Sequence, residues 1–232
     1  MHRLIAFILL TTFLVSCGAS IDPALQSKIN SYFGKSPSQS FSGSAKFMKP
    51  MAYKIGQYVV YGVTREGKRS ISKNAIVGSE SNGWIIETHS ITETNESIVQ
   101  MLVQGLERAV ESNNMDDLDI VWVKTRDKEG TIQSVEGPVL LLTKGLYKKA
   151  LVGFTVNVSS TLDGGSVSVP AGNFAMTTKI RSSVSLFGST YESDGWYHSA
   201  IPVHGLVKSI STDGEMSMEL LEFGLSGASK SF

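Results

Sequence analysis

The sequence predicts a mainly β domain: a curved antiparallel sheet, or incomplete barrel, of roughly ten strands with an amphipathic helix on its concave face. Short segments rich in β-branched and aromatic residues recur along most of the chain, and Gly, Asn and Asp pairs separate them. One central stretch instead carries apolar residues at helical spacing. Because an apolar helix stripe needs a partner, we expect it to pack against the hollow side of the sheet.

The first strands are predicted from residues 57–64, which are β-branched and aromatic, and from residues 70–77, where alternate residues Ile71, Lys73, Ala75 and Val77 lie on one side. Asn82-Gly83 then predicts a tight hairpin, because both central positions of such a turn favour positive φ. Residues 84–88 continue as the partner strand. Together these segments predict a three-stranded meander.

The central helix is predicted over residues 97–110. Ile98, Leu102, Leu106 and Ala109 recur at a spacing of three or four residues, which places them on one helix face.

The remaining pattern is mostly strand and turn. A short helix suits residues 138–150, with Lys144, Lys148 and Lys149 outside and an apolar set of Leu140, Leu141, Leu142, Leu146 and Tyr147. Asp163-Gly164-Gly165 and Asp213-Gly214 are typical of hairpin turns. The further strands are expected at residues 118–125, 131–134, 152–158, 166–169, 174–180, 184–187, 196–198, 206–210 and 216–223.

The N-terminus resembles a bacterial lipoprotein signal. Arg3 precedes an apolar run over residues 4–14 that is too short to span a bilayer, which needs roughly 20 residues. Small Ser16 then precedes Cys17, the single cysteine of the chain. The resemblance implies cleavage before Cys17, lipid on its sulfur, and anchoring in the bacterial cell envelope. The residue after Cys17 is not Asp, which favours the outer membrane.

Three regions follow from this pattern: a signal peptide at residues 1–16, a lipidated N-terminus at 17–46, and a half-barrel β domain at 47–232. Within the second region, Asp22-Pro23 predicts a helix start that runs to about residue 33. Residues 34–46 are rich in Ser, Gly and Pro, so we expect a flexible tether. Without residues 1–16, 20 basic residues face 21 acidic ones, and no basic surface for nucleic acid is expected.

Two later motifs carry a family resemblance. Val169 to Phe174 contains a Val-Pro-Ala-Gly turn, and a Pro-x-x-Gly-Leu-Val-Lys-Ser turn spans Pro202 to Ser209 before a last strand with Glu219. This order resembles an uncharacterised family of exported bacterial proteins. Their layout is similar to the fold of the periplasmic lipoprotein carrier and the outer-membrane lipoprotein receptor. That resemblance implies an incomplete barrel whose apolar groove holds acyl chains. Apart from the resemblance, the Pro and Gly residues of these motifs favour turns, and Lys208 and Glu219 are expected to pair across neighbouring strands.

Catalytic chemistry is not indicated. The sequence has no G-x-S-x-G or phosphate-binding loop, and no cysteine remains after lipidation. His89, His198 and His204 lack close metal-ligand spacing, and the acidic cluster from Asp116 to Asp119 lacks the glycine and terminal glutamate of a calcium loop. We therefore expect no cofactor, no metal site and no enzyme.

The remaining candidate site is an apolar pocket between helix and sheet, although the same residues also suit a closed core. The expected lining comprises Trp84, Met101, Leu102, Leu106, Trp122, Phe154, Phe174 and Met176. The first hypothesis is an anchored, non-enzymatic domain that binds an apolar ligand such as an acyl chain or another lipoprotein's lipid. The alternatives are a structural or surface-interaction lipoprotein with a closed core, and a hydrolase whose site a single sequence does not reveal.

Overall fold

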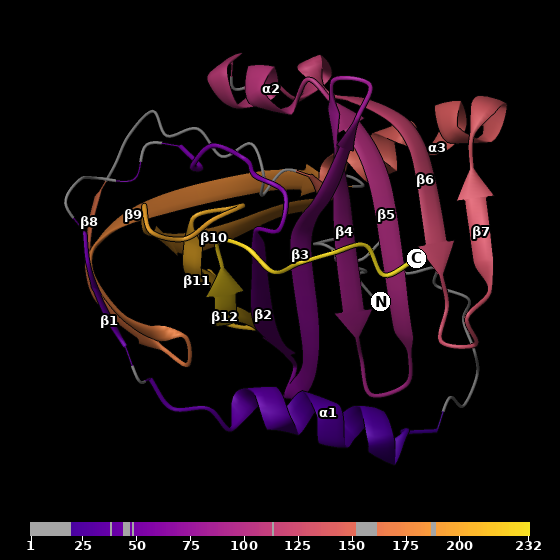
Figure 1. The fold of residues 1–232 in the computed structure, drawn as a ribbon. Helices are drawn as coiled ribbons and strands as arrows, with labels where there is room; N and C mark the ends of the chain where they lie inside the picture. The colour runs from indigo at the N-terminus through magenta and orange to yellow at the C-terminus, as the bar shows by residue number, and fades with distance from the viewer. Residues whose placement is uncertain are drawn as a thin grey trace.

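The computed structural model describes residues 20–37, 39–43, 47, 49–112, 114–151, 162–186 and 189–232. Within these ranges it contains a twelve-stranded sheet and three α-helices (Figure 1). The helices are α1 (Pro23–Phe33), α2 (Leu106–Ser112) and α3 (Gly137–Ala150), with a single 3₁₀ turn at Met115–Asp117. The strands are β1 (Ser40–Ser42), β2 (Tyr58–Arg65), β3 (Lys68–Glu80), β4 (Gly83–Ile91), β5 (Glu96–Gln104), β6 (Asp119–Arg126), β7 (Ile132–Val135), β8 (Leu162–Val169), β9 (Gly172–Leu186), β10 (Ser189–Tyr197), β11 (Leu206–Ser211) and β12 (Met216–Gly224).

The sheet is open and not closed into a barrel. Its strand order is β1-β9-β10-β11-β12-β2-β3-β4-β5-β6-β7, and β8 pairs with β9. All neighbours are antiparallel except β1 and β9, which run parallel. The central pairing of β2 with β12 joins residues that are far apart in the chain.

The main core lies inside the curve of the sheet. Inward-facing side chains of β2–β6 meet those of β8, β9, β11 and β12 there, as Ile86, Met101, Phe174 and Leu220 illustrate. Because residues from both halves of the sheet share one cluster, this face is the concave one. The predicted curved sheet is thereby confirmed.

The outer face of the sheet is also covered. Helix α1 packs Leu25 and Ile29 against one part of this face. The last residues of the chain cross another part, where Ala228 packs beside Ala75 and Leu102 (Figure 1). Strands β3–β5 are therefore buried on both sides.

The predicted helix over residues 97–110 is wrong. Residues 96–104 form β5, and only residues 106–112 are helical. In β5, Ile98 and Leu102 face outward while Val99, Met101 and Val103 face the main core. A strand buried on both faces loses its alternating pattern, so its apolar residues mimic helical spacing.

Helix α2 contributes Leu106, Ala109 and Val110 to the concave core, and a second helix, α3, also packs there. Its side chains Leu140 and Tyr147, with Leu151 directly after it, join the main core. Helix α1 forms where predicted: Asp22 accepts a hydrogen bond from the backbone N–H of Ala24 at 2.9 Å.

Several boundaries differ from prediction. The positive-φ residues of the β3–β4 hairpin are Ser81 and Asn82, one position earlier than expected. Asp163 to Gly165 lies inside β8 and is not a turn. The strands expected at 174–180 and 184–187 fall, up to residue 186, within a single strand, β9. The strand expected at residues 152–158 lies outside the described residues.

The expected flexible tether is partly built into the fold. Within residues 34–46, Ser40–Ser42 form β1 and pair with Asn173 to Ala175. Phe41 stacks on Phe174 with ring centroids 4.8 Å apart. Helix α1 and β1 therefore both belong to the folded domain.

Candidate functional site

The residues predicted to line an apolar pocket do not form one group. Met101, Leu106 and Phe174 are buried in the main core, and half-buried Trp84 packs against them. Leu102 and Trp122 lie on the opposite face of the sheet, under the chain's last residues. Met176 is 59% exposed, and Phe154 lies outside the described residues.

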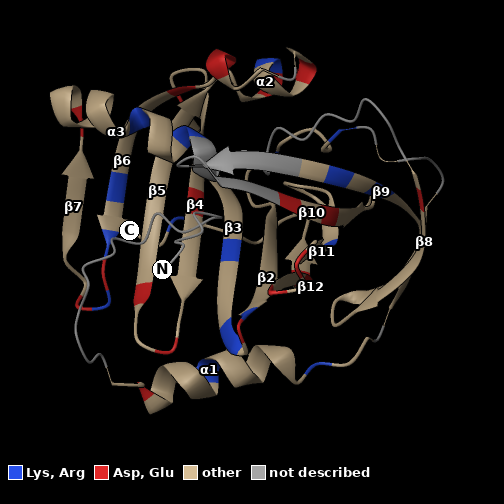
Figure 2. Cartoon of the chain, turned by 180° about the vertical axis from the view of Figure 1, so that it is seen from behind, with Lys and Arg blue, Asp and Glu red and all other residues tan. Residues whose placement is uncertain are grey.

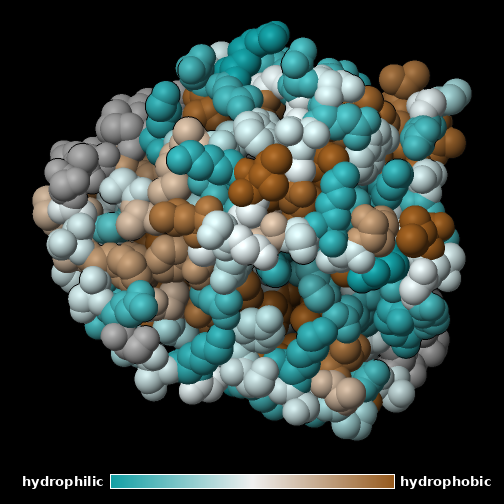
Figure 3. Space-filling view, viewed as in Figure 1, coloured by the Kyte–Doolittle hydropathy of each residue, from teal (hydrophilic) through white to brown (hydrophobic). Residues whose placement is uncertain are grey.

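An apolar surface is present on helix α3, which sequence reasoning did not select. Val139, Leu141, Leu142 and Leu146 are exposed, with Leu142 at 87% and Leu141 at 71%. Figure 3 shows hydrophobic side chains gathered at α3. We name these four residues the α3 apolar surface. The leucine run was visible in the sequence, but its outward orientation depends on how α3 docks.

Helix α3 is apolar on two sides. Leu140 and Tyr147 point into the main core, and burial raises the pKa of Tyr147. A helix that is apolar around most of its circumference is normally buried or in contact with lipid. Because one side of α3 faces solvent, this surface is suited to binding an apolar partner.

Polar contacts tie α3 to the start of β6 and to the 3₁₀ turn before it. Lys144 forms an ion pair with Asp119, and Lys148 Nζ donates to the backbone oxygen of Asp116 at 3.4 Å. Nearby Asp117 accepts a hydrogen bond from Ser112 Oγ at 2.5 Å. The acidic cluster from Asp116 to Asp119 thus stabilises the 3₁₀ turn after α2 and holds α3 against the sheet. Seen from behind, Figure 2 shows charges of both signs on α2, beside this region.

The histidines considered as metal ligands, His89, His198 and His204, occupy separate environments. His204 stacks on Tyr61 with ring centroids 5.8 Å apart, and His198 packs edge-on to Phe174 at 5.4 Å. His89 lies on the outer face beside Glu96. Across the described ranges, no three His, Cys, Asp or Glu side chains are grouped so that they could hold a metal ion.

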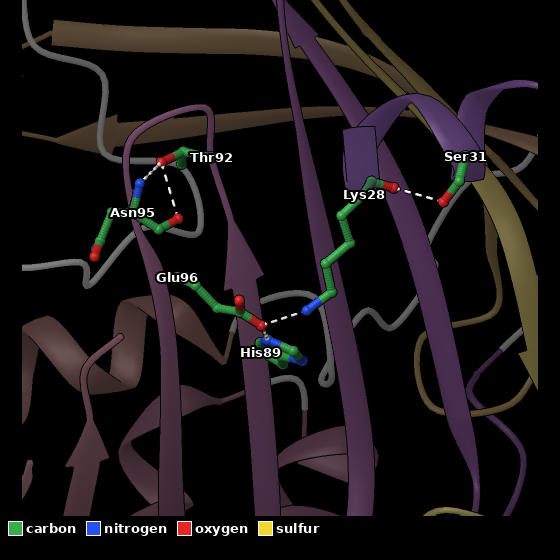
Figure 4. Close-up of polar contacts among 6 residues, drawn as sticks. All are labelled: Lys28, Ser31, His89, Thr92, Asn95 and Glu96. Carbon is green, nitrogen blue, oxygen red and sulfur yellow. Dashed lines mark hydrogen bonds and ion pairs between the residues drawn. The ribbon is translucent and has the colours of Figure 1, made fainter. Parts of the chain in front are cut away.

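A polar network attaches α1 to the outer face (Figure 4). Glu96 Oε1 accepts from Lys28 Nζ and contacts His89 Nε2, each at 2.6 Å. Burial lowers the pKa of His89, although Glu96 acts in the opposite direction. Burial raises the pKa of Glu96, but hydrogen bonds from Lys28 and His89 outweigh it, so the pKa lies below its ordinary value. This geometry serves attachment of α1.

A second polar network holds the chain's last residues. The buried carboxylate of Glu87 accepts from Gln100 Nε2 at 2.8 Å, and from the backbone N–H and Oγ of Ser231 at 2.9 and 2.7 Å. Arg126 donates to the backbone oxygen of Ser231 at 3.0 Å and lies over the Phe232 ring. Three donors on one buried carboxylate fix the position of this segment.

The motif residues have structural roles in the described parts of the chain. Gly172 begins β9 where β1 passes closely, and a Cβ there would meet Gln39 O at 2.9 Å. Val203 and Gly205 take positive φ in the turn before β11. Lys208 and Glu219 are cross-strand partners and form an ion pair at 2.8 Å, as predicted.

Comparison of the sequence with protein-family models and with curated proteins gives no match. None of the described helices is long and apolar enough to cross a membrane. The fold and the α3 apolar surface together define an open β half-barrel with an exposed apolar helix at one end.

Proposed function

We propose that this protein is a bacterial lipoprotein, anchored in the cell envelope by lipid on Cys17, whose half-barrel domain binds an apolar ligand without turning it over. The α3 apolar surface supports this proposal most directly. Leu141 and Leu142 expose most of their side chains to solvent on a helix whose other side belongs to the core. Cys17 itself lies outside the described residues.

An acyl chain is the ligand class that this surface fits best. Covering a leucine side chain contributes about 1.5–3 kcal/mol, so an acyl chain lying along Leu141 and Leu142 gains several kcal/mol before ordering costs. The only described charged side chains of α3 are Lys144 and Lys148. They contact Asp119 at the start of β6 and the backbone oxygen of Asp116. The ligand therefore contacts the helix through apolar groups.

A second candidate is a surface-interaction lipoprotein with a closed core. Met101, Leu106 and Phe174 are buried in a shared cluster, which favours packing over an internal pocket among the described residues. In that case the α3 apolar surface binds a partner protein.

Fatty-acid binding by protein lacking residues 1–17 tests the proposal. We expect co-purifying lipid by mass spectrometry and a saturable change in tryptophan emission on adding palmitate. The L141S/L142S double variant should bind at least about tenfold more weakly, which corresponds to 1.4 kcal/mol or more.

Ile55→Ser is the control, because Ile55 is also an exposed apolar residue, at 54%, and lies outside α3. It should bind like the unmodified protein. Absence of lipid together with unchanged tryptophan emission would overturn acyl binding and favour the surface-interaction candidate.

A further inference from the structure

We propose that the end of the sheet at which α1 begins lies against the bilayer that holds the Cys17 lipid, and that the α3 apolar surface is turned away from it. We name this end the anchor end; it comprises Asp22 and the β4–β5 turn, residues 92–95. The inference rests on the proposed lipidation of Cys17.

Helix α1 belongs to the folded domain. Leu25 and Ile29 are buried against the outer face of the sheet, where they contact side chains of four strands. Those partners are Val60, Ile71, Ile91 and Leu221. Burial of two such side chains contributes roughly 3–6 kcal/mol, so α1 is held firmly.

Polar contacts fix both ends of α1. At its start, the backbone N–H of Asp22 donates to the backbone oxygen of Glu93 in the β4–β5 turn at 2.8 Å. Along the helix, Lys28 pairs with Glu96 at 2.6 Å, and beyond it Lys35 pairs with Glu222 at 2.8 Å. The folded domain therefore begins at about residue 22, not after residue 46.

The connection from the lipid to the domain is consequently short. Five residue steps separate Cys17 from Asp22, and each spans at most about 3.6 Å, so the reach is about 18 Å or less. This connection cannot raise the anchor end far above the bilayer surface.

Helix α3 lies at the other end of the strands. Its Lys144 forms an ion pair with Asp119. Asp119 lies opposite Gln104, the last residue of β5, in the β5–β6 pairing. Strand β5 begins at Glu96 beside α1, and its nine residues span about 30 Å. Figure 1 shows α1 and α3 at opposite ends of β3–β6. A ligand therefore reaches the α3 apolar surface from the aqueous side.

Energy transfer to the bilayer tests this orientation in the lipidated mature protein, residues 17–232, reconstituted into phosphatidylcholine vesicles with acceptor-labelled headgroups. Donor dyes are placed at Thr94→Cys in the anchor end and, separately, at Glu111→Cys on α2, which lies at the α3 end. We expect clearly higher transfer efficiency from position 94 than from position 111.

Linker insertions provide the controls. A Gly/Ser insertion of about 20 residues between Ser20 and Ile21 adds roughly 25 Å of reach, so the two efficiencies should converge. The same insertion after Gly214, in the β11–β12 turn, should leave the difference intact. Equal transfer from both positions in the protein without insertions, or higher transfer from position 111, overturns the orientation.

Vesicle flotation separates this inference from the proposed function. Protein that floats but gives equal transfer refutes the orientation alone. Protein that does not float refutes the Cys17 anchor and, with it, the orientation.

Discussion

At the residue scale, burial makes the histidines sensitive to acid. Burial lowers the pKa of His204 to about 3, and it also lowers the pKa of His89 and His198. An unfolded chain takes up these protons near pH 6.5, whereas the folded chain resists them. The folded state therefore keeps its full free energy of unfolding, as far as these histidines determine it, above about pH 6.5. That free energy falls as the pH is lowered from there toward the folded-state pKa.

His204→Phe should flatten this dependence. The phenylalanine keeps an aromatic ring beside Tyr61 and removes the titrating group. From the pKa difference at His204, the unmodified protein loses about 2 kcal/mol more than the variant between pH 7.5 and pH 5. Urea denaturation at both pH values measures the difference.

Circular dichroism at pH 7.5 first establishes that the variant is folded, and His204→Gln replaces it if it is not. An equal loss of stability in a folded variant and in the unmodified protein would contradict the assignment to His204.

At the element scale, most strands were predictable because runs of β-branched and aromatic residues lie between turn residues. Helix α1 was also predictable, because Asp22 and Pro23 are local start signals. Strand β5 was not, because the cover on its outer face comes from the end of the chain, more than 100 residues away. The α3 apolar surface was hidden for a related reason: only docking decides which leucines of α3 face inward.

Residues 226–232 form no strand, but they pack on the outer face of the sheet and stabilise it as a helix or strand would. Removal of residues 226–232 should destabilise the protein by about 1–3 kcal/mol, since Ala75 and Leu102 lose cover and Glu87 loses two donors. Thermal denaturation measures the loss. Lys230→Ala is the control and should change the midpoint little. A truncated protein as stable as the full chain would show that this segment only rests on the sheet.

At the scale of the whole molecule, fold class was readable from the sequence, whereas the strand order was not. Local alternation predicts that strands exist, but the pairing of β2 with β12 depends on contacts between distant segments. For the same reason the sequence predicted a tether where the structure has β1, because its partner β9 lies about 130 residues further on.

The proposed anchor leads to a prediction for the whole protein. Cys17→Ser removes the sulfur that accepts the lipid, so the variant should lose incorporation of an alkyne-labelled fatty acid and leave the membrane fraction. Labelling in growing bacteria, followed by fractionation, checks this. Ser16→Ala keeps a small residue before the cysteine and should remain labelled. Labelling that persists in Cys17→Ser would place the lipid elsewhere.

The pairing of β2 with β12 also bears on how such a chain folds. The middle of the sheet is complete only when β12 pairs with the distant β2, and the part of the outer face at Ala75 and Leu102 is covered only by the segment around Ala228. Because both contacts join distant segments, local folding alone cannot complete the sheet, and we expect assembly of its centre to be a late step in folding.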